Sequence, residues 1–136
     1  MILAVDVGNS QIVTGCLGHD RTIFTERLST VWTKTELEYA VDFKTVLDIH
    51  KMDPAGIDGA VIASVVPQIT GIIGKAVRKI LPRGEIITLG PGIRTGLNIL
   101  MDNPGSVGAD LVAAAVAGLK EYPLPLIMID MEPLLR

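Results

Sequence analysis

The first ten residues combine a buried-strand pattern with side chains that could hold a phosphate. An apolar opening over residues 1–5 leads into Asp6-Val7-Gly8-Asn9-Ser10, which adds a carboxylate, a hydroxyl and two residues that tolerate positive φ. Gly8 lets the backbone approach a ligand, and amide N–H groups in such a turn can converge on an anion. Asp6, at the end of a buried strand, is costly to desolvate unless it binds a cation or accepts hydrogen bonds. A phosphate with its magnesium ion would use all these groups, but an ordinary hairpin with an Asx-type turn explains them equally well.

The composition indicates a single core-rich domain. The chain has 136 residues, of which 49% are hydrophobic and only 4% aromatic, so Val, Ile, Leu and Ala must build the core. A net charge of −3 without a long basic run gives no support for nucleic-acid binding. No apolar run approaches a membrane span, and the first residues lack a signal-peptide pattern, so we expect a cytoplasmic protein. The single cysteine, Cys16, excludes an internal disulfide and is expected to be buried.

The first half of the chain predicts three strands and a helix. A tight turn at Gly8-Asn9 joins the first strand to a second over residues 12–17, and alternation predicts a third over residues 21–28. Thr33 and Glu36 match the capping box of a helix that ends near residue 53, and Trp32 is expected to pack against its start. The helical spacing predicts an inward face made of Leu37, Ala40, Val41, Val46, Leu47 and Ile49.

Strands and helices then alternate. We expect a strand over residues 59–66, buried on both faces, and a helix over residues 68–81, in which Gly71 and Gly74 indicate close backbone packing. A fifth strand (residues 85–89), a helix (about 107–122) and a sixth strand (126–130) follow, with a Gly- and Pro-rich loop over residues 90–96. His19 and His50 are expected at the surface, and no His/Cys cluster suggests a zinc-type site.

This order of elements resembles the ribonuclease-H-like half-domain, an α/β fold in which a three-stranded antiparallel meander precedes alternating helices and strands. Actin, hexokinase and the acetate and sugar kinases use two such halves around an ATP cleft. Their first hairpin carries an Asp-x-Gly phosphate motif, which Asp6-Val7-Gly8 matches. The resemblance implies the first half of an actin-like ATPase fold. Strand order alone establishes no activity.

Further motifs resemble type III pantothenate kinase across residues 1 to about 130. The motifs, in chain order, are Asp6-Val7-Gly8-Asn9-Ser10, Ser64-Val65-Val66-Pro67, the segment 91–97 with Asp102-Asn103-Pro104, and Val107-Gly108-Ala109-Asp110. The resemblance implies phosphorylation of the primary hydroxyl of pantothenate by ATP, giving 4'-phosphopantothenate in the first step of coenzyme A synthesis. It also implies magnesium, a monovalent cation (potassium or ammonium) and a homodimer with pantothenate bound near the subunit interface.

The same resemblance assigns roles to single residues. Asp6, Gly8, Asn9 and Ser10 would cradle the ATP phosphates, with Asp6 near the magnesium ion, and Asp130 would hold the monovalent cation. Asp110 would be the general base, although a carboxylate in the first turn of a helix also stabilises that helix end. The implied substrate-binding residues are Arg94, Thr95, Met101, Gly108 and Ala109. For Arg94, a solvated loop cation remains the alternative.

Two departures from the family pattern matter. The usual Arg after Gly-Ala-Asp is Leu111 here, which weakens the substrate assignment. Residues 131–136 do not match the Gly-Thr-Ala-Thr motif that opens the family's second half. We therefore expect a domain over residues 1–122, then the first strand of a missing second half and an aberrant tail over 123–136, in an incomplete enzyme inactive alone. The alternatives are a non-catalytic binding or oligomerisation module left by truncation, and a superfamily kinase for another small hydroxylated substrate.

Overall fold

The computed structural model describes residues 1–89 together with residues 117, 120, 121, 123, 125 and 127. Its elements are β1 (Ile2–Val7), β2 (Gln11–Leu17), β3 (Thr22–Ser29), α1 (Glu36–Ile49), a 3-10 turn η1 (Pro54–Gly56), β4 (Gly59–Ser64), α2 (Pro67–Ile80) and β5 (Glu85–Thr88). The strands form one sheet in the order β3-β2-β1-β4-β5. β1, β2 and β3 are antiparallel, whereas β4 runs parallel to both β1 and β5. This topology confirms the ribonuclease-H-like half-domain.

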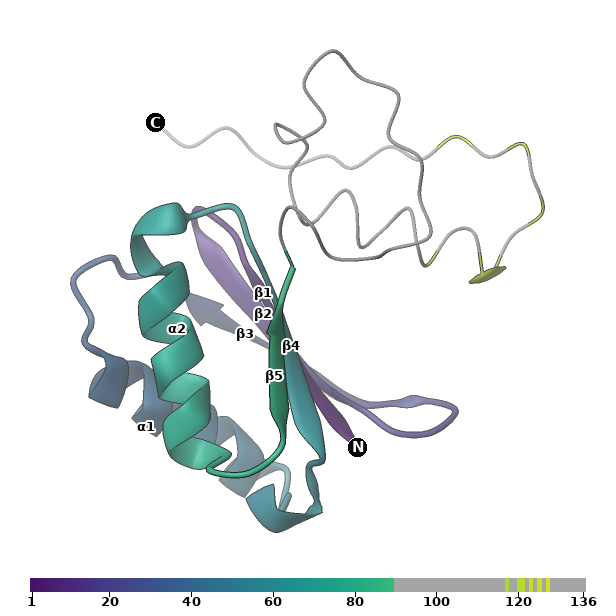
Figure 1. Cartoon of the computed structure of the whole chain (residues 1–136), viewed down its shortest axis with the longest axis horizontal. Helices are drawn as coiled ribbons and strands as arrows, with labels where there is room; N and C mark the ends of the chain where they lie inside the picture. The colour runs from purple at the N-terminus through teal and green to yellow at the C-terminus, as the bar shows by residue number, and fades with distance from the viewer. Residues whose placement is uncertain (90–116, 118–119, 122, 124, 126, 128–136) are drawn as a thin grey trace.

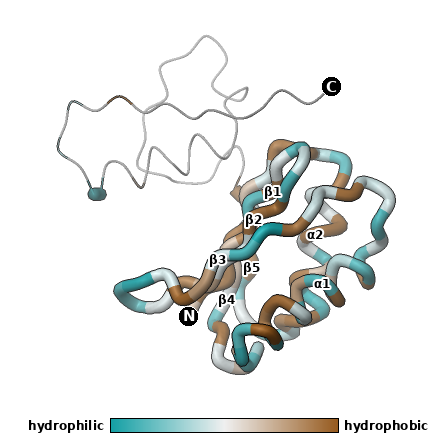
Figure 2. The backbone as a smooth tube through the Cα atoms, turned by 180° about the vertical axis from the view of Figure 1, so that it is seen from behind, coloured by the Kyte–Doolittle hydropathy of each residue, from teal (hydrophilic) through white to brown (hydrophobic). Residues whose placement is uncertain are grey.

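Both described helices cover the same face of the sheet (Figure 1). The strands alternate accordingly: Leu3, Val5 and Val7 of β1 are buried against the helices, and Asp6 between them is exposed. Cys16 of β2 is fully buried in this core, as predicted. The turn that joins β2 to β3 is polar and projects away from the helices (Figure 2).

The capping box of α1 begins two residues later than the sequence predicts. Thr35, not Thr33, is the N-cap: its hydroxyl accepts a hydrogen bond from the Glu38 N–H at 3.3 Å, and a Glu38 carboxylate oxygen accepts one from the Thr35 N–H at 3.1 Å. The segment 33–38 contains two overlapping Thr-x-x-Glu patterns. Tertiary contact selects the second, because the Tyr39 hydroxyl donates to the Val31 carbonyl at 2.7 Å and accepts from the Val31 N–H at 2.9 Å. These bonds hold the chain before α1 in a non-helical path.

The inward face of α1 also differs from the expected one. Tyr39 and Phe43 fill the core beside Ala40, Val46 and Leu47. The remaining predicted core residues are exposed, Leu37 by 62%, Val41 by 56% and Ile49 by 68%. Burying two aromatic rings one helical turn apart removes more apolar surface than burying these aliphatic side chains. Trp32, expected to pack against the helix start, is half exposed.

The glycines of α2 do not mark close packing. A methyl group built on Gly71 or Gly74 would meet nothing within 4 Å. Gly71 is exposed, and Gly74 is half-buried. The buried face consists of Ile69, Ile73, Ala76 and Val77, at helical spacing. The prediction of tight backbone approach at the two glycines is therefore wrong for the described part of the chain.

The predictions beyond residue 89 are tested at only a few positions. Ala117, Lys120 and Glu121, in the helix expected over 107–122, are helical and exposed. Ile127, in the strand expected over 126–130, is not in a strand, and its side chain is 87% exposed. Ile127 belongs to none of the five strands of the described sheet. The other residues of both elements lie outside the described residues. Among the described helices, none is long and apolar enough to cross a bilayer.

Candidate phosphate-binding site

The carboxyl ends of β1 and β4 meet at one edge of the sheet. Val7 pairs with Ser64 across the two parallel strands, and the Val65 N–H donates to the Val7 carbonyl at 3.0 Å. The β1–β2 turn and the start of α2 both leave the sheet at this edge (Figure 1). In open α/β sheets, ligands bind in the crevice outside the carboxyl ends of the parallel strands. The phosphate-binding chemistry expected of residues 6–10 therefore lies at an edge suited to ligand binding.

The tip of this turn lies one residue later than predicted. The Gly8 N–H donates to the Gln11 carbonyl at 2.9 Å, which leaves Asn9 and Ser10 as the two exposed tip residues. Neither Gly8 nor Asn9 has positive φ, since the described residues with positive φ are Lys51 and Gly84. Gly8 is needed for another reason: a Cβ there would lie 2.9 Å from the Gln11 carbonyl oxygen. Close backbone approach, rather than a left-handed conformation, explains the glycine.

Asp6 is exposed, not buried as its place in an apolar strand suggested. It points to the face of β1 away from α1 and α2, where its neighbours across the sheet are Val13 on β2 and Ala63 on β4. The alternation of β1 explains the error, because only one face of the strand is covered by the described helices. The turn over residues 8–11 is called the phosphate turn below, after its expected ligand. An exposed carboxylate beside this turn has the hard oxygen donors that magnesium prefers.

The metal chemistry open to this site is limited. No group of three or more His, Cys, Asp or Glu side chains that could hold an ion occurs in the part of the chain that the structure describes. Magnesium in kinases is usually bound by one or two carboxylates together with substrate phosphates and water. The residues present at the β1–β2 turn fit that kind of site rather than an all-protein cage.

Thr30 is a site residue that the sequence did not indicate. Its hydroxyl donates to the Gly8 carbonyl at 2.8 Å, and its N–H donates to the Ser10 carbonyl at 2.9 Å. Thr30 follows β3 directly, and the β2–β3 register, in which Gln11 faces Ser29, brings it beside the turn. A threonine after a strand carries no signal of its own, so only the register could have identified it.

A second hydroxyl network fixes the start of α2 beside the same turn. Ser64 Oγ accepts from the Val66 N–H at 3.1 Å, and Thr70 Oγ1 lies 2.8 Å from Ser64 Oγ and 2.9 Å from the Val66 carbonyl. α2 begins at Pro67 without a side-chain cap on its N-terminal amides. Ser64 is the first residue of the Ser-Val-Val-Pro motif, and the sequence alone predicts no role for its hydroxyl group. Its contacts give it a structural one, anchoring the junction of β4 and α2.

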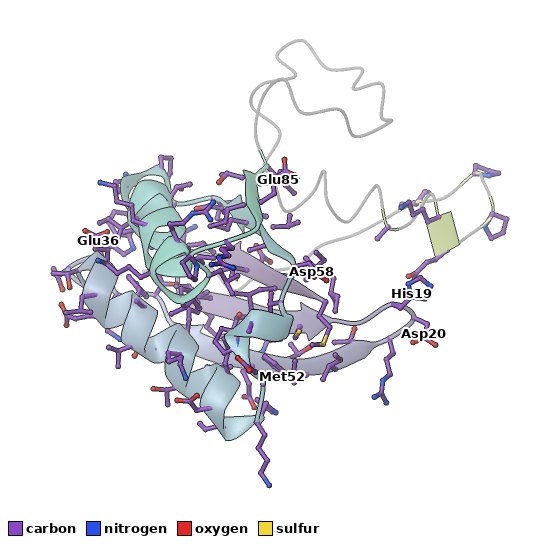
Figure 3. All side chains as sticks on the ribbon, turned by 60° about the horizontal axis from the view of Figure 1, so that its bottom comes forward. His19, Asp20, Glu36, Met52, Asp58 and Glu85 are labelled. Carbon is purple, nitrogen blue, oxygen red and sulfur yellow. The ribbon has the colours of Figure 1, made fainter. Side chains whose placement is uncertain are left out.

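The two histidines lie away from this edge. His19 and Asp20 are exposed at the tip of the β2–β3 turn, far from Glu36 at the start of α1 (Figure 3). His50 is half-buried, which corrects the surface prediction: it stacks on Phe24 and its Nε2 lies 2.8 Å from a Glu26 carboxylate oxygen. His50 lines a groove of about 260 Å³ between β3 and α1. Neither histidine can serve the phosphate turn.

The other predicted site residues lie outside the described residues. They are Arg94, Thr95, Met101, Gly108, Ala109, Asp110 and Asp130. The structure thus brings together Asp6, Gly8, Asn9 and Ser10, adds Thr30, and leaves the substrate side of the site as a prediction.

The topology is that of the half-domain of the actin-like ATPase fold, and an Asp-x-Gly turn lies at the carboxyl edge of its sheet. Comparison with known proteins narrows this class. The family model described as type III pantothenate kinase matches residues 2–132, and the chain belongs to that family.

The curated relatives carry the same name. The chain is 43% identical over 130 residues to the type III pantothenate kinase of Geobacillus sp. (strain WCH70), covering 96% of this chain and 50% of the relative. It is 41% identical over 130 residues to that of Halalkalibacterium halodurans, covering 96% and 51%. The chain thus spans about half the length of these relatives. It is also similar to a solved structure provisionally assigned to an N-acetylglucosamine kinase from Porphyromonas gingivalis, with a TM-score of 0.49, 18% identity, and coverage of 65% of this chain and 34% of that one.

Proposed function

We propose that this chain carries the phosphate-binding and pantothenate-binding half of a kinase that transfers a phosphoryl group from ATP to the primary hydroxyl of pantothenate, giving 4'-phosphopantothenate. The observation that carries the proposal is the match of residues 2–132 to the type III pantothenate kinase family. The exposed turn at the carboxyl edge of β1 and β4 supports it, because phosphoryl transfer relies on a positioned phosphate cradle.

The turn would act on the phosphates through its backbone amides and its polar side chains. Gly8 allows the tight turn, and the amides and side chains of the exposed residues Asn9 and Ser10 can donate hydrogen bonds to phosphate oxygens. Asp6 would hold magnesium through a carboxylate oxygen. When bound, magnesium neutralises negative charge on the phosphates during transfer. The chain's own contribution is to orient the phosphates at the sheet edge.

The substrate side is proposed from the family motifs. Asp110 would accept the proton of the pantothenate hydroxyl as it attacks the phosphorus. Arg94, Thr95, Met101, Gly108 and Ala109 would bind pantothenate, with Arg94 suited to its carboxylate. Asp130 would bind a potassium or ammonium ion. The domain boundary near residue 122 belongs to the same proposal.

We further propose a cytoplasmic homodimer. The small residues of the segment 113–118, of which Ala117 is helical and exposed, would allow two helices to approach closely. Packing of the same residues onto the sheet of their own domain is the alternative. Sedimentation at high micromolar concentration tests the proposal, and a strictly monomeric species would reject the dimer for this chain.

A chimera tests the activity. Residues 1–130 of this chain are joined to the second half of the Geobacillus relative, and ADP release and 4'-phosphopantothenate are measured with and without pantothenate. The second half alone is the control, and pantothenate-dependent ADP release from the chimera is expected. A folded chimera that phosphorylates a different hydroxylated compound, or that binds pantothenate without turnover, would overturn the proposal. Either result would favour another superfamily kinase or a binding module.

The chain alone should bind MgATP weakly, because it spans about half of its relatives and one turn supplies few of the contacts a nucleotide needs. Calorimetry on the 136-residue chain measures this directly. Tight, magnesium-dependent binding would show instead that this half holds a complete nucleotide site.

A further inference from the structure

Thr30 donates hydrogen bonds to two carbonyl groups of the phosphate turn. Its side-chain hydroxyl donates to the Gly8 carbonyl at 2.8 Å, and its backbone N–H donates to the Ser10 carbonyl at 2.9 Å. The backbone bond merely continues the β2–β3 ladder by one residue beyond Gln11 and Ser29. The side-chain bond does more, because it reaches across β2 to a carbonyl at the end of β1.

This side-chain bond fixes the orientation of one peptide plane. In a trans peptide, the carbonyl of one residue and the N–H of the next point in opposite directions. Because the Gly8 carbonyl points at Thr30, the Asn9 N–H must point away from Thr30 and from β3. The Asn9 N–H donates to no acceptor among the described residues, and Asn9 is exposed. The turn therefore presents a backbone donor on the side away from β3.

The opposite orientation of the same peptide would have the opposite electrostatic effect. If the Gly8–Asn9 peptide rotated by half a turn, the Gly8 carbonyl oxygen would replace the Asn9 N–H on that side. A carbonyl oxygen carries partial negative charge and repels an anion, whereas an N–H attracts one. Glycine places little steric restriction on such a rotation, so the turn needs an external bond to select one orientation.

We infer that Thr30 is a positioning residue for phosphate binding: its hydroxyl holds the Gly8–Asn9 peptide with the Asn9 N–H facing the anion. The inference rests on the proposed phosphate role of the turn. Thr30 touches no phosphate itself, because its hydroxyl proton is engaged by the Gly8 carbonyl. Serine would preserve this bond, and valine, which has nearly the same shape as threonine, would remove it.

The test compares three variants of the full chain by NMR. Thr30→Val removes the hydroxyl, Thr30→Ser retains it, and Thr25→Val is the matched control, since Thr25 is an exposed threonine on β3 whose hydroxyl does not contact the turn. Each ¹⁵N-labelled chain is titrated with pyrophosphate in magnesium chloride, and the shift of the Asn9 amide resonance gives the dissociation constant. Unfolding in urea is measured on every variant, so that a general loss of stability is recognised.

The expected result is a shift of the Asn9 amide in the wild-type chain, with equal affinity in Thr30→Ser and Thr25→Val. Thr30→Val should bind about two- to tenfold more weakly, the range produced by losing one neutral hydrogen bond. ¹⁵N relaxation should also show greater motion of Gly8 and Asn9 in that variant alone. Unchanged affinity and unchanged relaxation in a folded Thr30→Val would overturn the role of Thr30 while leaving the phosphate turn intact. No Asn9 shift in the wild-type chain would overturn both.

Discussion

The imidazole ring of His50 lies parallel to the phenyl ring of Phe24, with ring centroids 4.2 Å apart and an angle of 5° between the planes. His50 is the C-cap of α1, and Phe24 lies on β3, the edge strand of the sheet. Its Nε2 also lies 2.8 Å from a carboxylate oxygen of Glu26 on the same strand. One side chain therefore joins the end of the helix to the strand whose continuation carries Thr30.

We expect His50→Ala to lower the free energy of unfolding by about 1.5–2.5 kcal/mol. The stacked pair is worth about 0.5–1.5 kcal/mol, and the hydrogen bond to Glu26 adds about 1 kcal/mol. Urea unfolding followed by circular dichroism measures the change. His19→Ala is the control, because His19 is exposed at the β2–β3 turn and should leave stability unchanged. Equal stability of the two variants would show that the stack contributes nothing.

The sequence predicted the order and type of the described elements well, because alternation and helical spacing are local properties. The phosphate turn followed from Asp6, Gly8, Asn9 and Ser10, which are contiguous. What the sequence could not supply was the side of each element that faces the core. Asp6 was placed in a buried strand, but which face the helices cover depends on the whole sheet.

The sequence alone also could not decide between two local patterns that predict the same feature. Thr33 and Thr35 each precede a glutamate by three residues, and only the contact of Tyr39 with Val31 decides between them. Thr30 became visible as a site residue through the pairing of β2 with β3, which lies in tertiary structure. The site residues expected beyond position 89 stay predictions from motif resemblance.

Alanine at Gly71 or Gly74 is expected to stabilise the chain. Each glycine occupies an interior position of α2, and an added methyl group would meet no atom within 4 Å. Glycine in a helix costs about 0.5–1 kcal/mol relative to alanine, so each substitution should raise the free energy of unfolding by that amount.

Gly84→Ala supplies the opposing control. Gly84 has φ of +95°, and a Cβ there would lie 2.4 Å from the Asp58 carbonyl oxygen, so this variant should be destabilised. Thermal and urea unfolding show whether each of the three variants is more or less stable than the wild-type chain. A loss of stability in Gly71→Ala and Gly74→Ala would mean that this face of α2 is covered in solution.

Cys16 should make the stability fall at alkaline pH. Burial raises the pKa of the Cys16 thiol above its ordinary value, so the thiol stays protonated in the folded chain to higher pH than in the unfolded chain. The unfolded state then binds fewer protons once the pH passes the free-cysteine pKa of about 8.5. The buried neutral thiol therefore makes its full contribution to the free energy of unfolding below that pH. Above it, this contribution declines by about 1.4 kcal/mol per pH unit while only the unfolded thiol is ionised.

Comparing the wild-type chain with Cys16→Ala between pH 7 and pH 10 isolates this effect, because all other groups titrate in both proteins. The alanine variant should be less stable at pH 7 through lost packing, and the gap should narrow above about pH 8.5. A gap that stays constant to pH 10 would contradict the buried neutral thiol.

The last prediction separates two roles for Asp110 in the chimeric kinase. Asp110→Asn keeps the size of the side chain but removes the proton acceptor, so a general base there predicts a fall in turnover of about a hundred- to ten-thousand-fold. Nucleotide affinity should change little, because the proposed partner of Asp110 is the alcohol. Asp6→Asn should instead weaken the magnesium dependence as well as the rate, since its proposed partner is the metal ion.

If Asp110 only stabilises the start of a helix, Asp110→Asn should lower stability by about 1 kcal/mol or less and leave turnover nearly normal. Measuring turnover, magnesium dependence and melting temperature on both variants distinguishes these cases. Near-normal turnover in Asp110→Asn would reject the base assignment. Asp6→Asn serves as the internal comparison, because its proposed partner is the metal ion and not the alcohol.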